Sequence, residues 1–388
     1  MNKNTNNDKL YEPPLLQAYH NGDIDQFKTL IDQGENINCR AYDKQRLISH
    51  VIRNKKNISN NKEFFDLLID KGADIGPDDK SRGLLSVAII KQKDTYYARK
   101  LLENNLNVDS FGRYDTAPGD PLYYLDDGGT TPYGPPIFDA LFTENIDYIN
   151  LLVEYNFDVN IYDHLDRSVM EYFIGLTSFN KTESKKIFKI LIDYGADLDM
   201  LHTDGINLLS TIIKNEEYHL IKILFEKSEK IDINQKDFTG TTALMYAVLN
   251  GDTNIVKFLI EKGANIDIYN KYGFNSLRMA VRDDQMDIFK LMLKKSANLV
   301  LPNKEDNNNT ILHKLMYDAC DYFPNKSSHE WFDKYYKIIL NKHPELLSIK
   351  NDKGETPIDI LKKKNEYTPA RKKFFDKFKI KDNSYRIN

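Results

Sequence analysis

Several features common in other protein classes are missing from this 388-residue chain. It has only two cysteines, Cys39 and Cys320, which suits a reducing compartment and excludes a disulfide framework. No apolar run reaches the roughly 18 residues that a membrane span needs. Residues 1–9 are rich in Asn and Lys and contain no apolar stretch, so no Sec-type signal peptide is visible. We therefore expect a cytoplasmic protein or, for a bacterial or viral chain, one delivered into a host cell.

Catalytic signatures are also missing. The eight histidines are scattered, with no H-E-x-x-H or C-x-x-C spacing, and no phosphate-loop, dinucleotide-binding or G-x-S-x-G motif occurs. We expect no enzyme, no catalytic residue, no cofactor and no metal. One alternative is a hard-cation site formed by Asp120 with Asp126 and Asp127. The net charge of −4 argues against a strongly basic nucleic-acid binder, and we expect neither nucleic acid nor membrane as partner.

What the chain does contain is a helical hairpin that it repeats. From Thr239 to Ile268 a turn opens a short helix over 242–249, Asn250-Gly251-Asp252 breaks it, and a second amphipathic helix ends at Gly263. One such hairpin cannot bury both of its apolar faces. It needs a copy of itself on each side.

This unit resembles the ankyrin repeat, whose signature is T-P-L-H-x-A early and L-L-x-x-G-A-x-h-N late, where h is apolar. Residues 242–247 (T-A-L-M-Y-A) match the first part except at Pro and His, and residues 259–267 (L-I-E-K-G-A-N-I-D) match the second. The resemblance implies an all-α ankyrin-repeat solenoid of roughly nine to ten helix-turn-helix units with short β-hairpin fingers. His313, in T-I-L-H, sits at the family's own His position, where that side chain usually bonds neighbouring backbone.

The first motif can be followed along the whole chain by its Leu position. Its members are Leu15, Leu47, Leu85, Ile137, Val169, Leu208, Leu244, Leu277, Leu312 and Ile358. The steps between them are 32, 38, 52, 32, 39, 36, 33, 35 and 46 residues, against about 33 for an ankyrin unit. The predicted organisation is a disordered tail over 1–9, a repeat array over 10–366 with a long finger insertion at 111–136, and a capping segment over 367–388.

The Gly of the closing motif is expected at positive φ, where a Cβ costs roughly 1–2 kcal/mol. Asn105 and Asn156 replace it in two units, as the next-best residue for that conformation. Three smaller insertions, at 55–62, 177–185 and 321–330, are expected between the two helices of their units and to project from one edge. The third continues to Trp331, whose ring we expect to pack on the scaffold.

The long insertion has the composition of an adaptable binding loop, because it combines Gly, Pro and Asp with four tyrosines: Tyr114, Tyr123, Tyr124 and Tyr133. Residues 101–160 carry Arg113 against eleven carboxylates, a net charge of −10. Such a field attracts a basic partner. Residues 361–388 carry +7, with ten cations against three carboxylates, and are expected to form a polar cap or to contact an acidic surface.

The resemblance implies a concave face, made of finger tips and first helices, that binds other proteins. We predict a monomeric interaction module for a protein or peptide with a basic surface. Its predicted contact residues are Tyr42, Tyr162, Phe238, Tyr269 and Tyr272 at the finger tips, with Tyr114, Tyr123, Tyr124, Asp126, Asp127 and Tyr133 in the insertion. Two alternatives stay open: a bacterial or viral effector or immunity-type protein that inhibits a target enzyme, and an enzyme with its site in the insertion.

Overall fold

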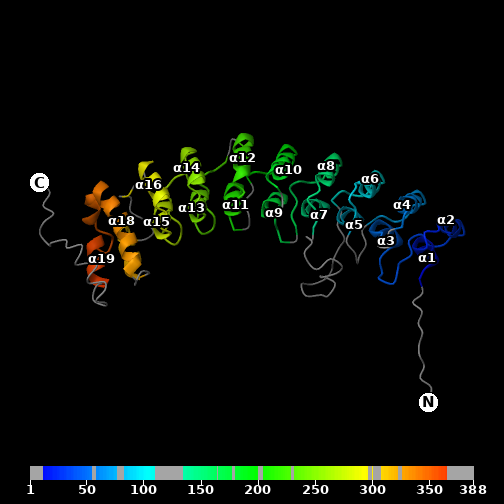
Figure 1. Ribbon diagram of the computed structural model, residues 1–388, viewed down its shortest axis with the longest axis horizontal. Helices are drawn as coiled ribbons and strands as arrows, with labels where there is room; N and C mark the ends of the chain where they lie inside the picture. Colours follow the sequence, from blue (N-terminus) through cyan, green and yellow to red (C-terminus); the bar gives the residue numbers. More distant parts are fainter. Residues whose placement is uncertain are drawn as a thin grey trace, which may run out of the picture. The chain divides into compact units, whose positions relative to one another are not determined.

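The computed structural model describes residues 12–54, 58–76, 83–109, 134–163, 165–176, 180–199, 204–228, 231–295, 299, 307–321 and 326–364. The chain divides into two compact units, unit 1 over Met1–Leu198 and unit 2 over Asp199–Asn388. In both units the described regular structure is helical (Figure 1). Within the described ranges, no helix is long and apolar enough to cross a membrane.

Unit 1 contains five helix pairs. Their bounds are α1 (Pro14–His20) with α2 (Ile24–Asp32), α3 (Leu47–Arg53) with α4 (Asn61–Asp70), α5 (Leu84–Lys91) with α6 (Tyr96–Glu103), α7 (Pro136–Phe142) with α8 (Ile146–Glu154), and α9 (Val169–Gly175) with α10 (Lys181–Asp193). The first helices pack on one another in chain order, α1 on α3, α3 on α5, α5 on α7 and α7 on α9. Each pair thus buries its apolar face against its neighbours, as a solenoid does.

Unit 2 continues the same plan. Its elements are α11 (Leu208–Lys214), η2 (Tyr218–Leu220), α12 (Ile221–Lys227), α13 (Ala243–Leu249), α14 (Thr253–Glu261), α15 (Ser276–Arg282), α16 (Met286–Lys294), α17 (Ile311–Asp321), α18 (Lys326–Lys342), η3 (Pro344–Leu347) and α19 (Pro357–Lys364). Helix α13 packs between α11 and α15, and α17 packs on α19. All ten positions of the first motif lie in the first helix of a pair or in α19.

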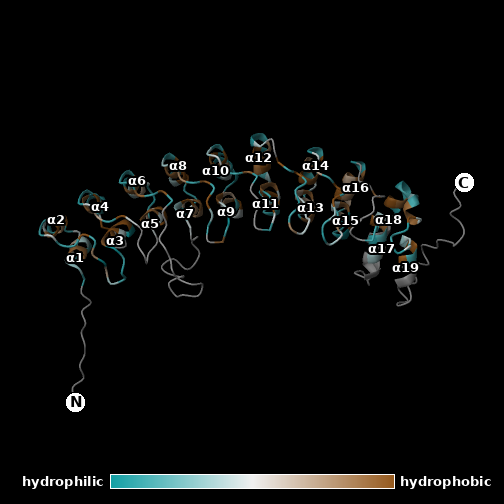
Figure 2. Ribbon diagram, turned by 180° about the vertical axis from the view of Figure 1, so that it is seen from behind, coloured by the Kyte–Doolittle hydropathy of each residue, from teal (hydrophilic) through white to brown (hydrophobic). Residues whose placement is uncertain are grey.

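The hairpin formed by α13 and α14 shows why the repeated sequence folds this way. The hydroxyl of Thr242 accepts a hydrogen bond from the Met245 amide at 3.4 Å, and the carboxylate of Asp252 accepts from the amides of Asn254 and Ile255 at 2.8 and 3.0 Å. These caps satisfy donors that have no partner within the helix. The predicted apolar face of α13 is fully buried, whereas α14 buries only Val256 and Leu259 because its outer side is solvated. Figure 2 shows the same contrast, with the hydrophobic colour concentrated where helices face one another.

Six of the described second helices are followed by a residue in the left-handed conformation that the closing motif predicts, whereas Ser228 after α12 is extended. Gly263 has φ +98°, and Asn105 and Asn156, which replace Gly, have φ +64° and +55°. An Asn side chain tolerates this region better than other residues with a Cβ. The prediction for these two positions is confirmed.

The prediction for the smaller insertions was wrong in part. Residues 181–185 belong to α10, which is 13 residues long, and residues 326–330 belong to α18, which is 17 residues long. Helices α14 and α16 have nine residues each. The extra sequence therefore lengthens the second helix of these pairs instead of forming only a loop. The reason is local: Asn180 caps α10 by accepting from the amides of Thr182 and Glu183, both at 3.0 Å.

Several predictions concern residues that lie outside the described ones. They include the tail over 1–9, most of the insertion at 111–136 with its four tyrosines and Asp120, Asp126 and Asp127, and the capping segment over 367–388. The side chain of Trp331 lies outside the described part as well.

Candidate functional site

The segments that connect the second helix of one pair to the first helix of the next are the fingers. Their tips are residues 41–45, 163–167, 237–241, 270–274 and 351–355. At each tip the amide of the first residue donates to the carbonyl of the fifth, at 2.9–3.0 Å. Two fingers add an isolated antiparallel bridge, Arg40 with Arg46 and Tyr162 with Ser168. In the described residues, the expected β-hairpins are therefore reduced to closed turns and single bridges.

The first residue of most tips also holds the turn with its side chain. Asp163 Oδ1 accepts from the amides of Leu165 and Arg167, both at 2.9 Å. Asp237 and Asn270 repeat this arrangement with the amides two and four residues ahead, at 2.8–3.0 Å. Asp and Asn are suited to this role because their short side chains reach their own backbone. The fingers are thus fixed turns rather than loose loops.

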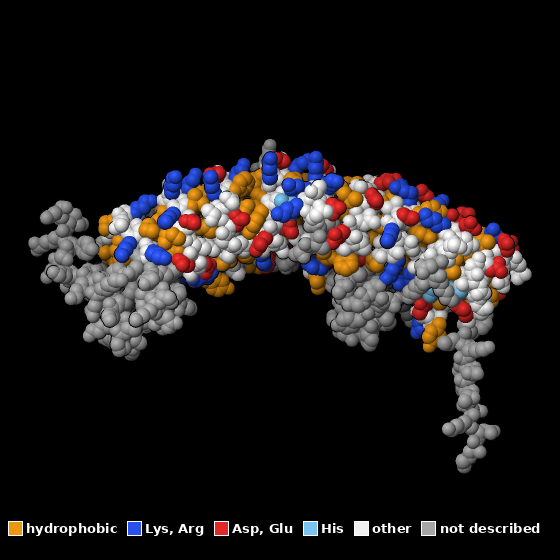
Figure 3. Space-filling view, viewed as in Figure 1, with side chains coloured by type: hydrophobic (Ala, Val, Ile, Leu, Met, Phe, Trp, Pro, Cys, Tyr) orange, Lys and Arg blue, Asp and Glu red, His pale blue; other side chains and the backbone are white. Residues whose placement is uncertain are grey.

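Exposed aromatic and aliphatic side chains are concentrated on these tips. In the described part of the chain six large hydrophobic residues are exposed, and five of them lie on or directly beside a tip: Tyr42 (77%), Tyr162 (50%), Leu165 (58%), Phe238 (64%) and Tyr272 (68%). The sixth, Leu249, ends α13. Figure 3 shows hydrophobic side chains projecting from the finger edge of each unit. Leu165 was not among the predicted contact residues, because a lone Leu in a polar turn gives no signal in the sequence.

Tyr269 does not follow the predicted pattern. Its side chain is half-buried, and desolvation, with the nearby Asp267 charge adding to it, raises the pKa of Tyr269 to about 12. The expectation that it is exposed like the other finger aromatics was wrong. Tyr269 directly precedes the tip that begins at Asn270, as Tyr162 precedes the tip at Asp163, yet Tyr162 is 50% exposed, so the place in the finger does not by itself decide exposure.

The finger tips of unit 2 are joined through their backbones. The Phe238 amide donates to the Asp204 carbonyl at 2.9 Å, and the Lys271 amide donates to the Thr239 carbonyl at 2.8 Å. Gly205 and Gly240 have φ of +80° and +81° and stand where the next finger approaches most closely. A Cβ on Gly205 would lie 2.7 Å from Phe238 Cδ1. The Phe238 ring therefore packs directly against Gly205, at a distance that leaves no room for a side chain there.

A part-buried polar contact with α13 holds the Asp237 tip in place. Tyr246, on α13, donates its hydroxyl to Asp237 Oδ2 at 2.7 Å, and Thr239 donates to Oδ1 at 2.7 Å. Burial alone would raise the pKa of the Asp237 carboxyl, but hydrogen bonds from Thr239, Tyr246 and Thr241 outweigh it and lower the pKa. The carboxylate is thus held ionised as a turn-forming acceptor.

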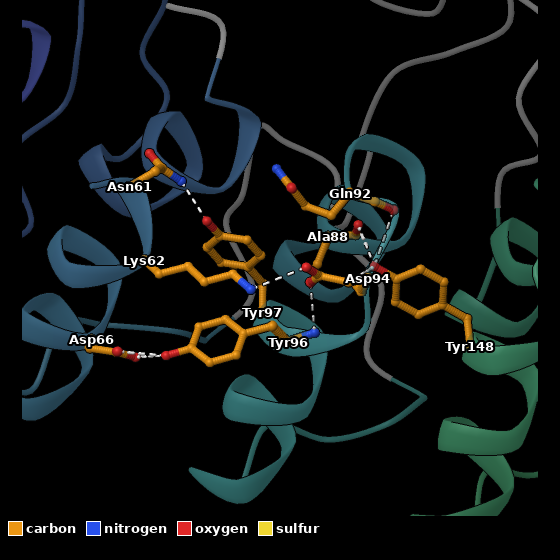
Figure 4. Close-up of polar contacts among 9 residues, drawn as sticks. All are labelled: Asn61, Lys62, Asp66, Ala88, Gln92, Asp94, Tyr96, Tyr97 and Tyr148. Atoms are coloured by element: carbon orange, nitrogen blue, oxygen red, sulfur yellow. Dashed lines mark hydrogen bonds and ion pairs between the residues drawn. The ribbon is translucent and has the colours of Figure 1, made fainter. Parts of the chain in front are cut away.

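Many of the 24 tyrosines are structural instead of exposed. Asn61 Oδ1 accepts from the Tyr19 hydroxyl at 2.8 Å, and Asn61 Nδ2 donates to the Tyr97 hydroxyl at 2.7 Å and to the Val51 carbonyl at 2.8 Å. These contacts form a hub around Asn61 that connects α1, α3, α4 and α6. Figure 4 shows its Asn61–Tyr97 part together with two neighbouring contacts, Tyr96 donating to Asp66 and the Tyr148 hydroxyl placed to donate to the carbonyls of Ala88, Gln92 and Asp94. Tyrosine frequency alone therefore does not identify a binding surface; exposure does.

Neighbouring repeats are also joined at their closing motifs. The last polar residue of one closing motif accepts a hydrogen bond from a backbone amide in the closing motif of the next repeat. Asn38 Oδ1 accepts from the Asp74 amide, Asn160 Oδ1 from the Asp197 amide and Asn234 Oδ1 from the Asn265 amide, at 2.8–2.9 Å. Asn160 Nδ2 also donates to the Gly195 carbonyl at 3.2 Å. The sequence shows these residues as a repeated letter, and only the structure shows that each bonds to the next unit.

His313 has the scaffold role that its motif position implies. It is fully buried, its Nδ1 accepts from the Thr310 amide at 3.1 Å, and its Nε2 lies 2.9 Å from the Glu355 carbonyl. Since a carbonyl only accepts, Nε2 carries the proton and the ring is neutral. Burial lowers the pKa of His313, although the Glu355 carbonyl opposes the shift. Among the described residues no group of three or more His, Cys, Asp or Glu side chains is placed to hold a metal ion.

Stacked helix pairs joined by closed finger turns define a helical repeat protein, and comparison with known proteins specifies which kind. Residues 177–270 match the family model for ankyrin repeats (3 copies). This segment therefore contains ankyrin repeats, as its motifs predict, and repeats of this kind are typical of protein-interaction modules.

Two curated relatives carry the same description. An ankyrin repeat protein of Acanthamoeba polyphaga mimivirus is 32% identical over 142 residues, 36% of this chain. One of Fowlpox virus (strain NVSL) is 32% identical over 133 residues, 34% of this chain. The matched segments span only 18% and 29% of those relatives' own lengths. The crystal structure of the ankyrin repeat domain of Bcl-3, a member of the IkappaB protein family, aligns over 59% of this chain and 91% of its own, with 19% identity and a TM-score of 0.47.

Proposed function

We propose that this protein is a non-catalytic module that binds a protein or peptide through the finger tips and first helices of its repeats. One observation carries the proposal: within the described residues, exposed large hydrophobic side chains are almost confined to the finger tips. Aromatic side chains of this kind anchor protein interfaces because they bury large areas at little cost in conformational entropy. The fixed turns and joined backbones below them lower the cost further, since the binding surface is already ordered.

We further propose that the partner has a basic surface and also contacts the insertion at 111–136. The support is the net charge of −10 over residues 101–160 and the tyrosine-rich composition of the insertion. Opposite charges accelerate encounter, and this contribution is screened by salt. Binding should therefore weaken when ionic strength is raised. The protein is proposed to act as a monomer in a cytoplasm, its own cell's or a host's.

A second candidate is supported by the viral origin of both curated relatives. In this alternative the same surface holds a target enzyme and inhibits it. The surface and its residues are the same in both versions, and only the consequence for the partner differs. Assaying the activity of a captured enzyme with and without the chain distinguishes them.

The test of the proposal compares three versions of the full chain in pull-down and then in quantitative binding with the purified partner. The first is unchanged, the second carries Tyr42→Ser, Tyr162→Ser, Phe238→Ser and Tyr272→Ser, and the third carries Lys257→Ser, at an exposed position on the second helix α14, as a control outside the proposed surface. We expect binding to be lost only in the second, with all three unfolding at similar temperatures. Unchanged binding by the second version would refute the finger face.

A fourth version without residues 112–134 separates the contribution of the insertion. A partner lost only from this version would move the main recognition element to the insertion. A partner retained by it but lost from the four-serine version would confine recognition to the finger tips.

A further inference from the structure

At the start of unit 1 a cavity of about 420 Å³ opens between the first finger and the first helices of two consecutive pairs. Its lining residues are Glu12, Leu16, His20, Ala41, Tyr42, Asp43 and His50. Leu16 and His20 belong to α1, His50 to α3, and Ala41, Tyr42 and Asp43 to the finger tip. The volume lies within the ~300–1,000 Å³ range of ligand sites. Figure 3 shows histidine and acidic side chains gathered at this end of unit 1.

Two carboxylate–imidazole pairs form the polar wall of the cavity. Glu12 Oε1 lies 2.6 Å from His20 Nδ1, and Asp43 Oδ1 lies 3.0 Å from His50 Nε2. Asp43 Oδ1 also accepts from the Gln45 amide at 3.1 Å, which fixes the carboxylate relative to the finger. The two imidazole rings meet edge to face, with centroids 6.4 Å apart. The carboxylates are thus held in place before any ligand arrives.

The remaining wall is apolar and aromatic. Leu16 is 2% exposed and forms the floor, whereas Tyr42 stands at the rim with 77% of its surface exposed. The histidine side chains are 16% and 13% exposed, and those of Glu12 and Asp43 are 38% and 39% exposed. The acidic groups therefore face the opening, and the imidazoles back them from inside.

We propose that this cavity binds the side chain of an arginine from the protein partner. The lining contains two carboxylates and no Lys or Arg side chain, so it favours a positive group. Each carboxylate uses one oxygen on its histidine, and a carboxylate has room for further donors. The planar guanidinium fits this surface better than an ammonium, because it donates in a fork to carboxylate oxygens and stacks on an aromatic ring such as Tyr42.

The inference rests on the proposed function, since it names one contact that the finger face makes, but its test needs no partner. N-acetyl-arginine amide is titrated into the full-length protein at about pH 8, where an ordinary imidazole is neutral. N-acetyl-citrulline amide, which has the same shape without the charge, is the control ligand. We expect the ring signals of His20 and His50 in the NMR spectrum to shift with the arginine probe and not with citrulline.

Two variants show whether the carboxylates are responsible. Glu12→Gln with Asp43→Asn should weaken the response to arginine at least tenfold. Glu103→Gln with Asp147→Asn removes the same charge from exposed positions outside the cavity and should leave the response within twofold. An equal response to citrulline, or an unchanged response in the first variant, would overturn the proposal.

Two further experiments test whether the cavity binds an anion or the chain's own N-terminal lysines instead of an arginine. If inorganic phosphate shifts the same histidine signals more strongly than arginine, the cavity is an anion site and the proposal is wrong. If arginine binds only after Lys3→Gln and Lys9→Gln, the chain's own N-terminal lysines occupy the cavity, which also overturns it. A cavity that ignores arginine while the finger variants still lose their partner would refute this inference alone.

Discussion

The two units share one kind of contact between repeats and differ in the others. The Asn side chains of the closing motif join repeats in both units. Unit 1 adds hydrogen bonds from tyrosine hydroxyls: Tyr19 on α1 and Tyr97 on α6 meet on Asn61, and Tyr148 on α8 reaches the chain between α5 and α6. Unit 2 adds backbone hydrogen bonds between fingers, Phe238 to Asp204 and Lys271 to Thr239. The tyrosine hydrogen bonds of unit 1 lie away from the fingers, so they can form even when neighbouring fingers differ in length. The backbone hydrogen bonds of unit 2 form only when neighbouring finger tips are aligned with each other.

The steps between repeats are nearly even where the backbone hydrogen bonds between fingers occur. The first-helix positions of unit 1 are 32, 38, 52 and 32 residues apart, whereas the steps from Leu208 to Leu244 and on to Leu277 are 36 and 33. Where the steps are regular, neighbouring fingers can bond and form an even surface. Where they are not, the same family plan leaves room for inserted sequence on the finger side.

The largest effect is expected at the hub of unit 1. Replacing Asn61 with Leu leaves the Tyr19 and Tyr97 hydroxyls buried without this partner, and each unsatisfied group costs about 1–3 kcal/mol. We expect a loss of about 3 kcal/mol, seen by hydrogen exchange in α1–α6, with the exchange of α13–α16 unchanged because damage in a solenoid stays local. Asn104→Leu, at an exposed position, is the control. Uniform loss of protection across both units would contradict the local character of the ties.

The backbone ties of unit 2 are tested by comparing two glycines with similar φ. Gly263→Ala adds a Cβ with nothing within 4 Å, so only the left-handed backbone opposes it and the cost should be about 1 kcal/mol. Gly240→Ala places a Cβ 3.0 Å from Asn270 Cα and 3.2 Å from the Lys271 amide nitrogen, both backbone atoms. The next finger must move, so we expect about 2–3 kcal/mol. Equal destabilisation by the two, measured by urea unfolding, would show that the finger contacts contribute little.

A smaller effect is expected from acid. The pKa of His313 is lower in the folded protein than in the unfolded chain, so the unfolded chain binds more protons below the ordinary histidine pKa of about 6.5. Stability contributed by the neutral ring is complete above that pH and declines as pH falls below it. Amide protection around α17 and α19 should fall between pH 7.5 and 5.5. His313→Gln, which keeps one donor and one acceptor, should flatten the dependence; an identical pH dependence in this variant would assign the effect to other groups.

The smallest change in stability is expected at the exposed aromatics. Phe238→Ser and Tyr272→Ser remove side chains that are 64% and 68% exposed, so thermal unfolding should change by less than about 0.5 kcal/mol. Partner affinity should nevertheless fall at least tenfold, since anchor residues dominate binding free energy. A large loss of stability would mean that these rings support the scaffold. Lys257→Ser, on the second helix α14, again serves as the exposed control.

The periodic parts of this molecule could be predicted from the sequence because the ankyrin unit has a strict letter pattern. The ten first-helix positions, the left-handed Asn105 and Asn156 and the scaffold role of His313 follow from spacing and capping chemistry. The exposed positions of Tyr42, Phe238 and Tyr272 follow from their place in the fingers.

What the sequence does not reveal depends on contacts between residues far apart. The burial of Tyr269, the exposure of Leu165 and the extension of α10 and α18 into inserted sequence are set by tertiary position rather than by local pattern. The Asn61 hub joins residues 42 and 36 positions away. The two imidazole–carboxylate pairs come together only because α1, α3 and the first finger stack. Nothing in the spacing of Glu12, His20, Asp43 and His50 marks them as one site.

The most direct measurement is hydrogen exchange of the full chain, alone and saturated with its captured partner. If the finger face binds the partner, new protection appears at the finger-tip amides around 237–241 and 270–274 and on the first helices beside them, with α14 and α16 unchanged. Protection confined to the outer faces of α14 and α16, with the finger tips exchanging as in the free protein, would contradict it.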